Sequence, residues 1–528
     1  MENCLKLGFV ISLLLLSIKP IDASQLAKPT VFDETERVVI EWLAPDNQAT
    51  SMYVRYGFNG WDLDFSGATE DYAYGSIAYR ATKEMKFDAE SATYRIEIDK
   101  PTNAKALHYV FCRNACESGD WFNNSGLDYH YSFEFPLMGP VLTWGTDQNP
   151  ETELTVSIKD SRKGRFWLQL KSSDKQEWGS RTYAQRDSDN WYRFKLNWMK
   201  FDAGSEVSYR MGVGDEVLSS DFQLRVPDNK VIDKKVRFAV FGDVQDDGRG
   251  GRTKNTMKAL AKLTEDLDFI ISTGDLAWND HPGDWWTFFD LSKNVLSRIP
   301  FMPSIGNHDT PGNNSNFNAD SFVRQFSLPD INRDKTFYRF RYGNTRFLAL
   351  NSDRVDELQA FNQQFSYAED WANPEKPTKW NFAYWHIGPL NIGARHWRQM
   401  YIGRQLSGLL SERTDMIFNG HEHLYQRFDP VSVRYEELYE PILQNSAGLR
   451  FVTVPPAGAF PEGRVRITDD AENLRELLAF PKLDNDQEIV EAFNGFVIVT
   501  VTTNKLLLET YKVDGGEFSV VDRLSYAK

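Results

Sequence analysis

Two histidines one residue apart give this chain its clearest chemical signal. His421 and His423 follow Gly420 at the end of an apolar run that starts at Ile417. Such a run is typical of a buried strand, and the glycine lets the backbone turn tightly. Side chains two apart on extended chain share one face, so both imidazoles would reach neighbouring points. Neutral imidazole is the commonest metal ligand, and the pair therefore indicates a metal site, although His-x-His also occurs in ordinary loops.

Four apolar stretches upstream end in the same way, with a carboxylate, an amide or an imidazole. The polar residues are Asp243 after residues 237–241, Asp275 after 269–271, Asn307, His308 and Asp309 after 303–305, and His386 after 382–385. In open α/β sheets, ligands bind at the carboxyl ends of the strands, where such residues converge. Recurrence across five segments makes coincidence a poor explanation, so the sequence predicts one site built from several strand ends.

The length and composition set the elements that must position this site. The chain has 528 residues, of which 41% are hydrophobic and 26% are charged. That length is enough for roughly three to four domains. Aromatic residues at 14%, including 15 Trp, favour β-rich domains. The net charge of -15 argues against nucleic acid or anionic membranes as partners.

The first residues are typical of a secretory signal peptide. Lys6 precedes an apolar run over residues 7–18, and Pro20 and Ala23 follow it. We therefore predict a signal peptide over residues 1–23, and a secreted or periplasmic protein. The run is too short to span a bilayer comfortably, and no later run of about 18 apolar residues occurs. The mature chain is accordingly expected to have no membrane anchor.

Removal of that segment leaves only two cysteines, Cys112 and Cys116. In an oxidising compartment they would close a small loop as a disulfide, which is the interpretation we favour. Two reduced thiols are the alternative, and a Cys-x-x-x-Cys pair without neighbouring histidines is a poor zinc motif.

Residues 28–135 have the composition of a β-sandwich, with short strands separated by Asn, Asp, Gly and Pro. Two phrases, residues 55–61 and 120–126, resemble those of starch-binding carbohydrate-binding modules. The resemblance implies that Trp61 and Trp121 stack on sugar rings; the alternative is that both fill the sandwich core. Such modules usually carry a histidine near the first phrase, where this chain has Arg55.

Residues 137–227 alternate polar and apolar positions as half-buried strands do, for example over 153–158, 165–170 and 191–196. This segment is similar to the fibronectin type III-like domain that precedes the catalytic domain of purple acid phosphatases. No chemistry is visible in it, so we interpret it as a spacer, followed by a linker over residues 227–235.

Residues 234–528 carry all five motif segments and alternate strands with helical stretches. Apolar periodicity predicts a helix over 253–265 and indicates another over 284–295. Strand composition returns near the end, over 495–501 and 505–511. The alternation predicts a layered α/β domain.

The ordered set Gly-Asp, Gly-Asp, Gly-Asn-His-Asp, His and Gly-His-x-His resembles the calcineurin-like metallophosphoesterase superfamily, and in particular purple acid phosphatases. The resemblance implies a four-layer αββα domain, here preceded by two β-sandwich domains, with two metal ions at the strand ends. It also implies that Asp275 bridges the ions. The remaining ligands would be Asp243 and His423 for the first metal, and Asn307, His386 and His421 for the second.

The implied chemistry is consistent with these residue types. Carboxylate, amide and imidazole ligands suit Zn, Mn or Fe without choosing among them. A metal-bound hydroxide would attack phosphorus in line, with charge on the oxygens stabilised by both ions and by His308. His308 would also donate a proton to the leaving oxygen, and Asp309 would orient its ring.

Two positions depart from the family pattern. Purple acid phosphatases have a tyrosine three positions after the bridging aspartate, and this chain has Trp278. Indole does not ligate metals, so we expect no purple chromophore. In the first motif, Gln245 stands where many relatives have histidine and purple enzymes have glycine. Its amide oxygen would ligate the first metal, or act from just outside the ligand shell.

Several other polar residues lie near the motifs in sequence. We expect surface roles for Arg252, Asn279, His281, His396 and Arg427, with His281 and His396 as the exceptions that could contact phosphate. Glu422, between the two ligand histidines, is expected to point away from the metals.

The sequence thus predicts an exported metallophosphoesterase acting on phosphate monoesters of a small molecule or polymer. A glucan polysaccharide is a further expected partner if the first module binds sugar. Alternatives are a phosphodiesterase acting on nucleotides or lipids, and a carbohydrate-binding protein with an inactive phosphatase domain.

Overall fold

The computed structural model describes most of the chain. The described residues are 29–33, 36–43, 51–58, 69–73, 76–89, 93–100, 106–113, 115, 121–122, 129–132, 138–145, 149–150, 152–162, 164–219, 221–226, 235–245, 251–278, 280, 282–310, 318–329, 336–354, 358–372, 378–407, 410, 414–432, 443–444, 448–467, 474–484 and 487–528. The predicted signal peptide, Trp61, Cys116, Asn279 and His281 lie outside them. Among the described helices, none is long and apolar enough to cross a membrane.

The N-terminal β-region contains two sheets. The first has the order β1-β2-β7-β6, formed by Thr30–Asp33, Arg37–Leu43, Thr93–Asp99 and Lys86–Asp88. The second has the order β10-β8-β3-β5-β4, formed by Tyr129–Ser132, Ala106–Arg113, Met52–Phe58, Ser76–Glu84 and Thr69–Ala73, and β9 (Trp121–Phe122) pairs with β8. The Trp42 ring stacks on Phe111 at 4.3 Å between centroids, so large rings fill this core.

Two predictions in this region keep open parts. Cys112 is disulfide-bonded, as expected for an oxidised pair, while Cys116 lies outside the described residues. Trp121 lies in β9, but its side chain is also outside the description. Sugar binding by Trp61 and Trp121 therefore stays a prediction.

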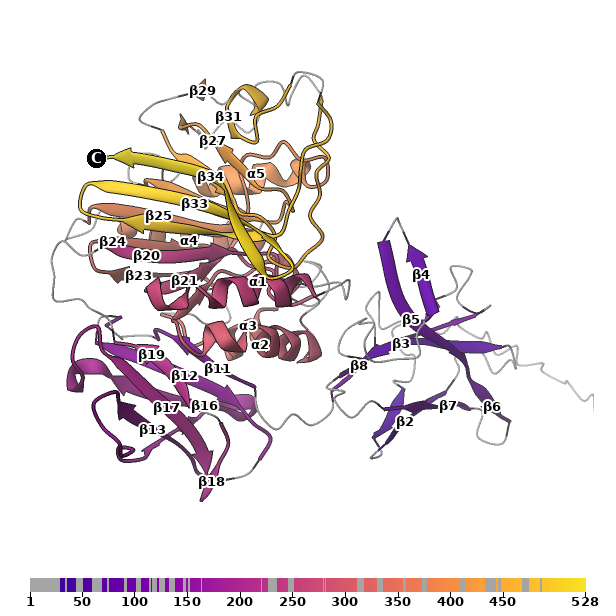
Figure 1. Ribbon diagram of the computed structural model, residues 1–528. Helices are drawn as coiled ribbons and strands as arrows, with labels where there is room; N and C mark the ends of the chain where they lie inside the picture. The colour runs from indigo at the N-terminus through magenta and orange to yellow at the C-terminus, as the bar shows by residue number, and fades with distance from the viewer. Residues whose placement is uncertain are drawn as a thin grey trace, which may run out of the picture. The chain divides into compact units, whose positions relative to one another are not determined.

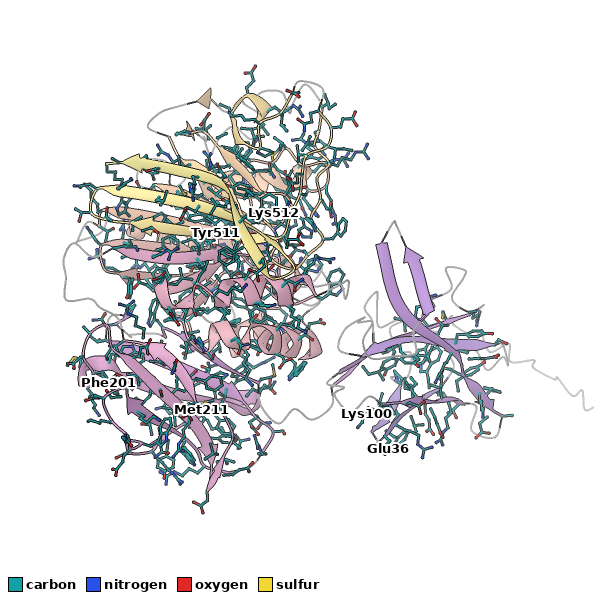
Figure 2. All side chains as sticks on the ribbon, in the orientation of Figure 1. Glu36, Lys100, Phe201, Met211, Tyr511 and Lys512 are labelled. Atoms are coloured by element: carbon teal, nitrogen blue, oxygen red, sulfur yellow. The ribbon has the colours of Figure 1, made fainter. Side chains whose placement is uncertain are left out.

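A second β-region forms a sandwich of two antiparallel sheets. One has the order β11-β12-β16-β15, formed by Met138–Thr143, Glu153–Lys159, Trp191–Asn197 and Gln185–Arg186. The other has the order β14-β13-β17-β18, formed by Thr182–Tyr183, Phe166–Ser172, Glu206–Val213 and Glu216–Val217, with β19 (Phe222–Arg225) on β17. Strands β16 and β17 alternate in part, as predicted, and Met211 of β17, labelled in Figure 2, is fully buried. Strand β12 is instead buried at every position over 154–158, so the half-buried alternation predicted there was wrong.

This sandwich and the C-terminal region share one hydrophobic core. Trp144, just after β11, stacks on Tyr342 and meets the edge of Phe269. The Tyr209 hydroxyl, buried in the sandwich, donates a hydrogen bond of 2.7 Å to the carbonyl oxygen of Ser297. Figure 1 shows the sandwich against the helices and sheets that follow it. The predicted spacer is thus packed tightly onto the domain that it precedes.

The C-terminal region is built on two sheets. The first has the order β22-β21-β20-β32-β33-β34, formed by Phe301–Pro303, Phe269–Ser272, Val236–Phe241, Gly495–Val501, Lys505–Asp514 and Glu517–Ala527. The second has the order β23-β24-β25-β26-β30-β27-β31, formed by Tyr338–Tyr342, Thr345–Ala349, Trp380–Ile387, Met416–Gly420, Arg450–Thr453, Gln426–Phe428 and Leu478–Phe480. A separate two-stranded sheet pairs β28 (Val431–Ser432) with β29 (Leu443–Gln444). Strands β20, β21 and β22 run parallel, as do β24, β25, β26 and β30.

The two large sheets pack face to face through aromatic rings. Phe238 of β20 makes edge contacts with Phe347, Phe382 and Phe418 of the second sheet. The residues next to Phe347, Phe382 and Phe418 in sequence point to the opposite face of the second sheet. They pack into a separate core with helices α4 (Leu358–Ala372) and α5 (Met400–Ser407). This inside–outside alternation follows from the period of two along a strand.

Helices cover the outer faces of both sheets. Helix α1 (Arg252–Ala261) packs against β32, β33 and β34, and next to α2 (Pro282–Leu296). A short helix α3 (Asp320–Gln325) follows. Two sheets between helical layers confirm the predicted αββα fold, and the helix predicted over residues 253–265 ends at Ala261.

The polar strand ends gather at one edge of the two packed sheets. Three of them follow β20, β21 and β22 of the first sheet, and two belong to β25 and β26 of the second. Strand β22 ends at Pro303, earlier than the stretch 303–305 predicted from sequence. His386 lies inside β25, where the pairing with β26 is irregular between Tyr384 and Ile387. Such bulges re-aim side chains, and this one directs an imidazole to the sheet edge.

Candidate metal centre

Three of the predicted ligands have an unusual backbone conformation. Asp243, Asp275 and His421 have φ angles of 50°, 57° and 69°. This left-handed region is uncommon outside glycine and costs on the order of 1–3 kcal/mol per residue. A Cβ on Gly306 would lie 2.2 Å from Asp275 Oδ1, and one on Gly420 would lie 2.5 Å from Asp243 Oδ2. The glycines of the motifs therefore leave room for the two carboxylates.

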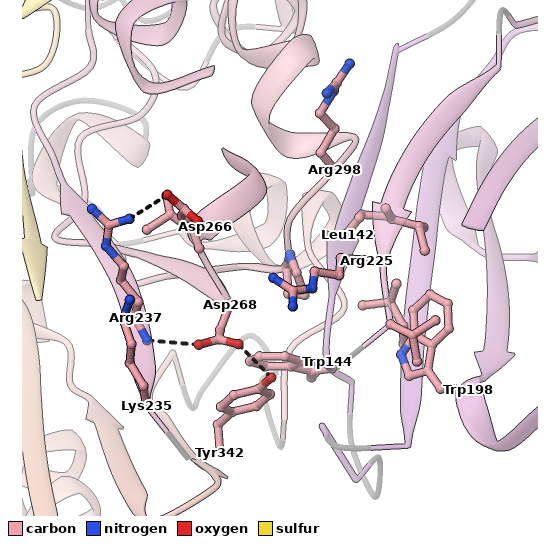
Figure 3. A pocket seen from close by; sticks show the side chains of 15 residues that line it. Leu142, Trp144, Trp198, Arg225, Lys235, Arg237, Asp266, Asp268, Arg298 and Tyr342 are labelled. Carbon is pink, nitrogen blue, oxygen red and sulfur yellow. Dashed lines mark hydrogen bonds and ion pairs between the residues drawn. The ribbon is translucent and has the colours of Figure 1, made fainter. Parts of the chain in front are cut away.

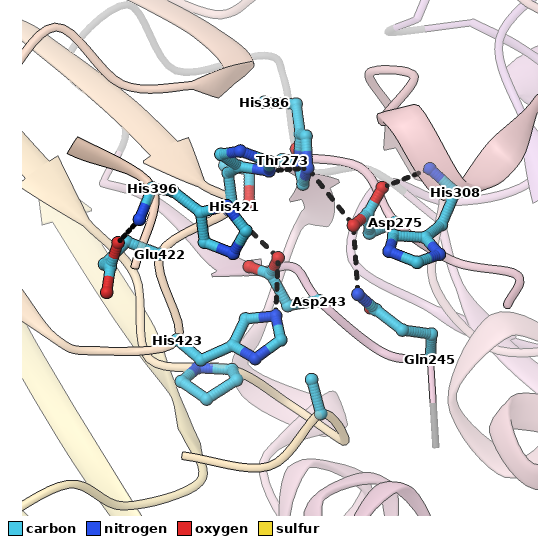
Figure 4. Close-up of polar contacts among 12 residues, drawn as sticks. Asp243, Gln245, Thr273, Asp275, His308, His386, His396, His421, Glu422 and His423 are labelled. Atoms are coloured by element: carbon cyan, nitrogen blue, oxygen red, sulfur yellow. Dashed lines mark hydrogen bonds and ion pairs between the residues drawn. The ribbon is translucent and has the colours of Figure 1, made fainter. Parts of the chain in front are cut away.

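Four ligand atoms meet at the position predicted for the second metal, and Figure 4 shows three of the residues that supply them, Asp275, His386 and His421. The Nε2 of His386 lies 3.0 Å from Asn307 Oδ1, 3.2 Å from Asp275 Oδ2 and 3.1 Å from His421 Nδ1. Its Nδ1 lies 2.9 Å from the carbonyl oxygen of Thr273, which can only accept a hydrogen bond. Burial lowers the pKa of this imidazole, but the carboxylates of Asp275 and Asp243 raise it to about 10, so a metal ion would have to replace the Nε2 proton before the Nε2 lone pair could bind it.

This geometry fits a metal ion. Ligands on a tetrahedral Zn²⁺ at about 2.0–2.1 Å stand roughly 3.3 Å apart, close to the distances between these atoms. A neutral Nε2, a carboxylate oxygen and an amide oxygen are all acceptors, so a cation between them would satisfy every one. Asp275, His386 and His421 are buried and their ligand atoms lie within 4.8 Å of one another.

The first predicted metal position lies beside Asp243. One carboxylate oxygen of Asp243 accepts a hydrogen bond of 2.9 Å from the backbone N–H of His421, and Oδ2 is buried without a hydrogen-bond partner. His423 Nε2 lies 3.7 Å from Asp243 Oδ1, and its Nδ1 lies 3.1 Å from the carbonyl oxygen of Phe460. His423 thus has the same orientation as His386, with one nitrogen held by the backbone and the other facing the site.

Gln245 contacts the predicted bridging carboxylate. Its Nε2 donates a hydrogen bond of 2.9 Å to Asp275 Oδ2, while its Oε1 is buried without a partner. An unsatisfied buried acceptor costs free energy, and a cation would remove that cost. Gln245 therefore lies within reach of the site, and its ligation of the first metal stays a prediction.

Burial keeps two of the imidazoles in the neutral form that binds metals. It lowers the pKa of His423 to about 3, and holds the pKa of His421 well below its ordinary value. For Asp243, burial raises the carboxyl pKa to about 7, because the charged form lacks compensation. A bound cation would supply that compensation and keep Asp243 ionised.

His308 lies at the open side of the site. Its Nδ1 is 2.6 Å from the carbonyl oxygen of Trp278, and its backbone N–H donates to Asp275 Oδ1 at 2.9 Å. The Trp278 ring lies 5.4 Å from the His308 ring between centroids. Trp278 thus holds the imidazole in place, where relatives with tyrosine would ligate iron, and Nε2 remains available to a substrate.

The role expected for Asp309 was wrong. Its fully buried carboxylate accepts hydrogen bonds from the backbone N–H groups of Asp275, Leu276, Ala277 and Gly306, at 2.7–3.0 Å. These bonds hold the turn that carries the bridging carboxylate. The His308 ring is oriented by Trp278 instead, since the four backbone donors already occupy Asp309.

Glu422 is buried and connects two loops behind the site. One of its carboxylate oxygens accepts hydrogen bonds from Asn391 Nδ2 at 2.5 Å and from the backbone N–H of His396 at 3.1 Å. It points away from the ligand atoms, as predicted, and it fixes the segment 391–399. On that segment, the His396 ring lies 4.2 Å from the His421 ring, and Gln399 Oε1 contacts His421 Nε2.

Sequence reasoning missed Gln399 as a contact of a ligand histidine. The available signal was its spacing, three positions after His396 in the short helical turn Trp397–Gln399. Of the other polar candidates, Arg427 pairs with Asp522 at 2.6 Å, and Arg252 donates to the carbonyl oxygen of Gly458 at 2.8 Å. Both arginines therefore have structural contacts.

Comparison with known proteins agrees with this geometry. The family model "Calcineurin-like phosphoesterase" matches residues 236–425. Purple acid phosphatase 21 of Arabidopsis thaliana is 24% identical over 340 residues, which cover 61% of this chain and 72% of that protein. Probable inactive purple acid phosphatase 24 of the same plant is 25% identical over 341 residues, covering 58% of this chain and 53% of that protein. The chain thus spans about half to three quarters of these curated relatives.

Solved structures show the same fold. Purple acid phosphatase PPD1 from yellow lupin (Lupinus luteus) matches with a TM-score of 0.58 at 17% identity, over 93% of each chain. A structure of PhoD matches with a TM-score of 0.54 at 12% identity, over 75% of this chain and 92% of that one. The predicted resemblance is confirmed: residues 236–425 match the calcineurin-like phosphoesterase model, and the chain is similar to purple acid phosphatases.

Proposed function

We propose that this chain is an exported phosphatase that hydrolyses phosphate monoesters at a centre of two metal ions. The observation that carries the proposal is the meeting of Asn307, His386, His421 and Asp275 at distances of 3.0–3.2 Å, with acceptor atoms facing one another. Four such groups are not stable together without a cation or an extra proton. The likeness to purple acid phosphatases supports phosphate esters as the substrate class.

The predicted ligands would be shared between the two ions. Asp275 would lie between the two ions, with Asp243, His423 and Gln245 on one side and Asn307, His386 and His421 on the other. Bound Zn, Mn or Fe would supply Lewis-acid chemistry, lowering the pKa of water and neutralising phosphate charge.

Substrate contacts would come from the two histidines on the open side. His308, held through Nδ1, presents Nε2 to the ester, where it would stabilise negative charge and protonate the leaving oxygen. His396 is partly buried beside the ligand His421 and would contact a phosphate oxygen. The backbone hydrogen bond from His396 to Glu422 fixes where that contact can be made.

The preference for monoesters and the export of the chain rest on other observations than the metal centre. The likeness to purple acid phosphatases 21 and 22 of Arabidopsis thaliana supports the preference for monoesters. The pattern of residues 1–23 supports export. A glucan partner depends on Trp61 and Trp121, and starch or glycogen pull-down with the mature protein tests it directly.

The decisive experiment combines metal content with hydrolysis. We expect about two metals per chain by elemental analysis, and hydrolysis of p-nitrophenyl phosphate well above that of bis(p-nitrophenyl) phosphate. His421→Ala is expected to lose metal and turnover together. Asp221→Asn, at an exposed carboxylate of the sandwich, is the control and should match the wild type.

Each outcome has a distinct meaning. Faster hydrolysis of the diester would replace the monoester proposal with a phosphodiesterase. A folded, metal-loaded protein without turnover on either ester would support an inactive domain, as the name of purple acid phosphatase 24 suggests for that relative. Absence of metal after supplementation would overturn the metal centre itself.

A further inference from the structure

A polar cavity lies between the sandwich and the first large sheet, away from the metal centre (Figure 3). Its volume is about 290 Å³. The sandwich contributes residues of β11, β12 and β19, and the C-terminal region contributes residues that precede or begin β20, β21 and β22. A space of this size accepts a small organic molecule.

The charges that line this cavity are unbalanced. Asp266 pairs with Arg237 at 3.2 Å, and Asp268 accepts hydrogen bonds from the Arg237 backbone N–H and the Tyr342 hydroxyl. Both carboxylates are therefore engaged. In contrast, the described residues place no carboxylate within 4 Å of the side-chain nitrogens of Arg225, Lys235 and Arg298, three further cations on the cavity wall.

This cationic lining is opposite in sign to the rest of the molecule. The whole chain has a net charge of -15. A cluster of cations in a concave surface concentrates positive potential and attracts anions there, even on an acidic protein. Arg225 lies on the sandwich and Arg298 on the segment before β22, so both regions contribute a cation to the lining, although the Arg298 guanidinium points away from that of Arg225 (Figure 3).

The remaining wall is apolar. Trp144 and Trp198 line the cavity, together with Leu154 and Leu224. Both tryptophans are almost fully buried, at 0% and 4% exposure, so their positions are fixed by packing. A rigid apolar wall beside Arg225, Lys235 and Arg298, which have no carboxylate partner among the described residues, suits a ligand that has one anionic group and one apolar part.

The cavity lies at the opposite end of the strands from the metal ligands. Val236, Phe269 and Phe301 begin the three strands after which Asp243, Asp275 and Asn307 follow. Strands of three to six residues, together with the turns that follow them, separate the two places by on the order of 15–20 Å. An anion in the cavity is therefore not a substrate at the metal centre.

We propose that this cavity is a binding site for a small organic anion, with a phosphate, sulfonate or carboxylate group bound by Arg225 in the positive potential of Lys235 and Arg298, and an apolar body against Trp144 and Trp198. The proposal does not depend on phosphatase activity. A sulfonate is a suitable probe because a phosphatase does not hydrolyse it.

The test is calorimetric titration of the full-length, metal-loaded protein with 2-naphthalenesulfonate. We expect one site per chain, and binding at least about tenfold weaker in the double variant Arg225→Ala/Arg298→Ala, because a charge-assisted contact and a second positive charge of the lining are lost. The matched control is Lys195→Ala/Lys200→Ala, which removes the same charge from exposed positions of the same sandwich and should leave the affinity unchanged.

Two further arms locate the bound probe. Asp275→Asn, which alters the metal centre, should keep the wild-type affinity for the sulfonate. Naphthalene without the sulfonate, and sulfate without the ring, should each bind more weakly than the complete probe. Equal affinity in the wild type and the Arg225→Ala/Arg298→Ala variant, loss of binding in Asp275→Asn, or no binding by the wild type would each overturn the proposal.

Discussion

Strands β20, β21 and β22 carry different surfaces at their two ends. At the C-terminal ends, acceptor atoms of Asp275, Asn307 and His386 face one another in a buried space, and Asp243 and Asp275 have left-handed backbone. At the N-terminal ends, the carboxylates are satisfied, Arg225, Lys235 and Arg298 have no carboxylate partner among the described residues, and the described residues lining the cavity have no positive φ.

The contrast shows how the candidate catalytic site differs from the candidate binding cavity. At the metal centre, a strained backbone holds acceptor groups that repel each other close together. This arrangement costs free energy of folding and requires particular residues. The cavity requires only exposed cations beside buried rings, and it depends on how two regions pack. The predictions below test how separate the two ends are.

The largest effect is expected at the bridging carboxylate. Asp275→Asn should reduce kcat/KM for an aryl phosphate by at least about 10³-fold, because one ligand of both ions loses its charge. Elemental analysis should show fewer than two metals per chain. Full activity with two metals retained would contradict the bridging role.

Asp309→Asn should destabilise the fold rather than change the chemistry directly. An amide cannot accept hydrogen bonds from all four backbone donors that contact Asp309, and its N–H groups would face two of them. We expect a loss of roughly 2–4 kcal/mol in the free energy of unfolding, measured by denaturant titration. Thr310→Ser, which keeps a hydroxyl next to Asp309 in the chain, serves as the comparison. Unchanged stability of Asp309→Asn would rule out this role.

A smaller effect is expected at Glu422, which fixes the loop carrying His396. Glu422→Ala should lower kcat/KM about tenfold, mainly through KM, since the loop loses two hydrogen bonds while the ligands stay in place. Glu422→Gln keeps an oxygen acceptor and should recover much of the loss. Equal damage in both variants, together with loss of metal, would show that Glu422 supports the ligands instead.

The smallest effect is expected at the cavity. Arg225→Ala/Arg298→Ala should leave kcat/KM within about twofold and stability within about 0.5 kcal/mol per position, because both side chains are exposed. Steady-state kinetics and thermal melting measure this. A large change in kcat/KM would mean that the two strand ends are coupled.

Much of the site was predictable because its ligands follow strand ends marked by glycine. The pairs Gly242-Asp243, Gly274-Asp275 and Gly420-His421 combine an apolar run, a turn residue and a ligand within a few positions. The αββα layers were predictable through the same ordered motifs. Only the position of His386 required more, because a bulge in β25 directs it to the edge.

The parts that sequence did not reveal all depend on contacts between distant segments. The hydrogen bond from Asn391 to Glu422 joins residues 31 positions apart, and Glu422 occupies the variable position of its motif while Asn391 belongs to none. Asp309 was adjacent to His308 in sequence, yet its four donors are backbone groups, which carry no residue-specific signal. Trp144 and Tyr342 both line the cavity and stack on each other, a contact that no local pattern indicates.

The left-handed backbone at Asp243, Asp275 and His421 also bears on how such a protein changes over evolutionary time. Glycine adopts this conformation without strain, so a ligand-to-glycine substitution relieves the backbone while it removes metal binding. Stability and catalysis are therefore opposed at these positions. Once selection for hydrolysis is relaxed, the gain in stability favours loss of the ligands. The fold then remains after the activity is lost.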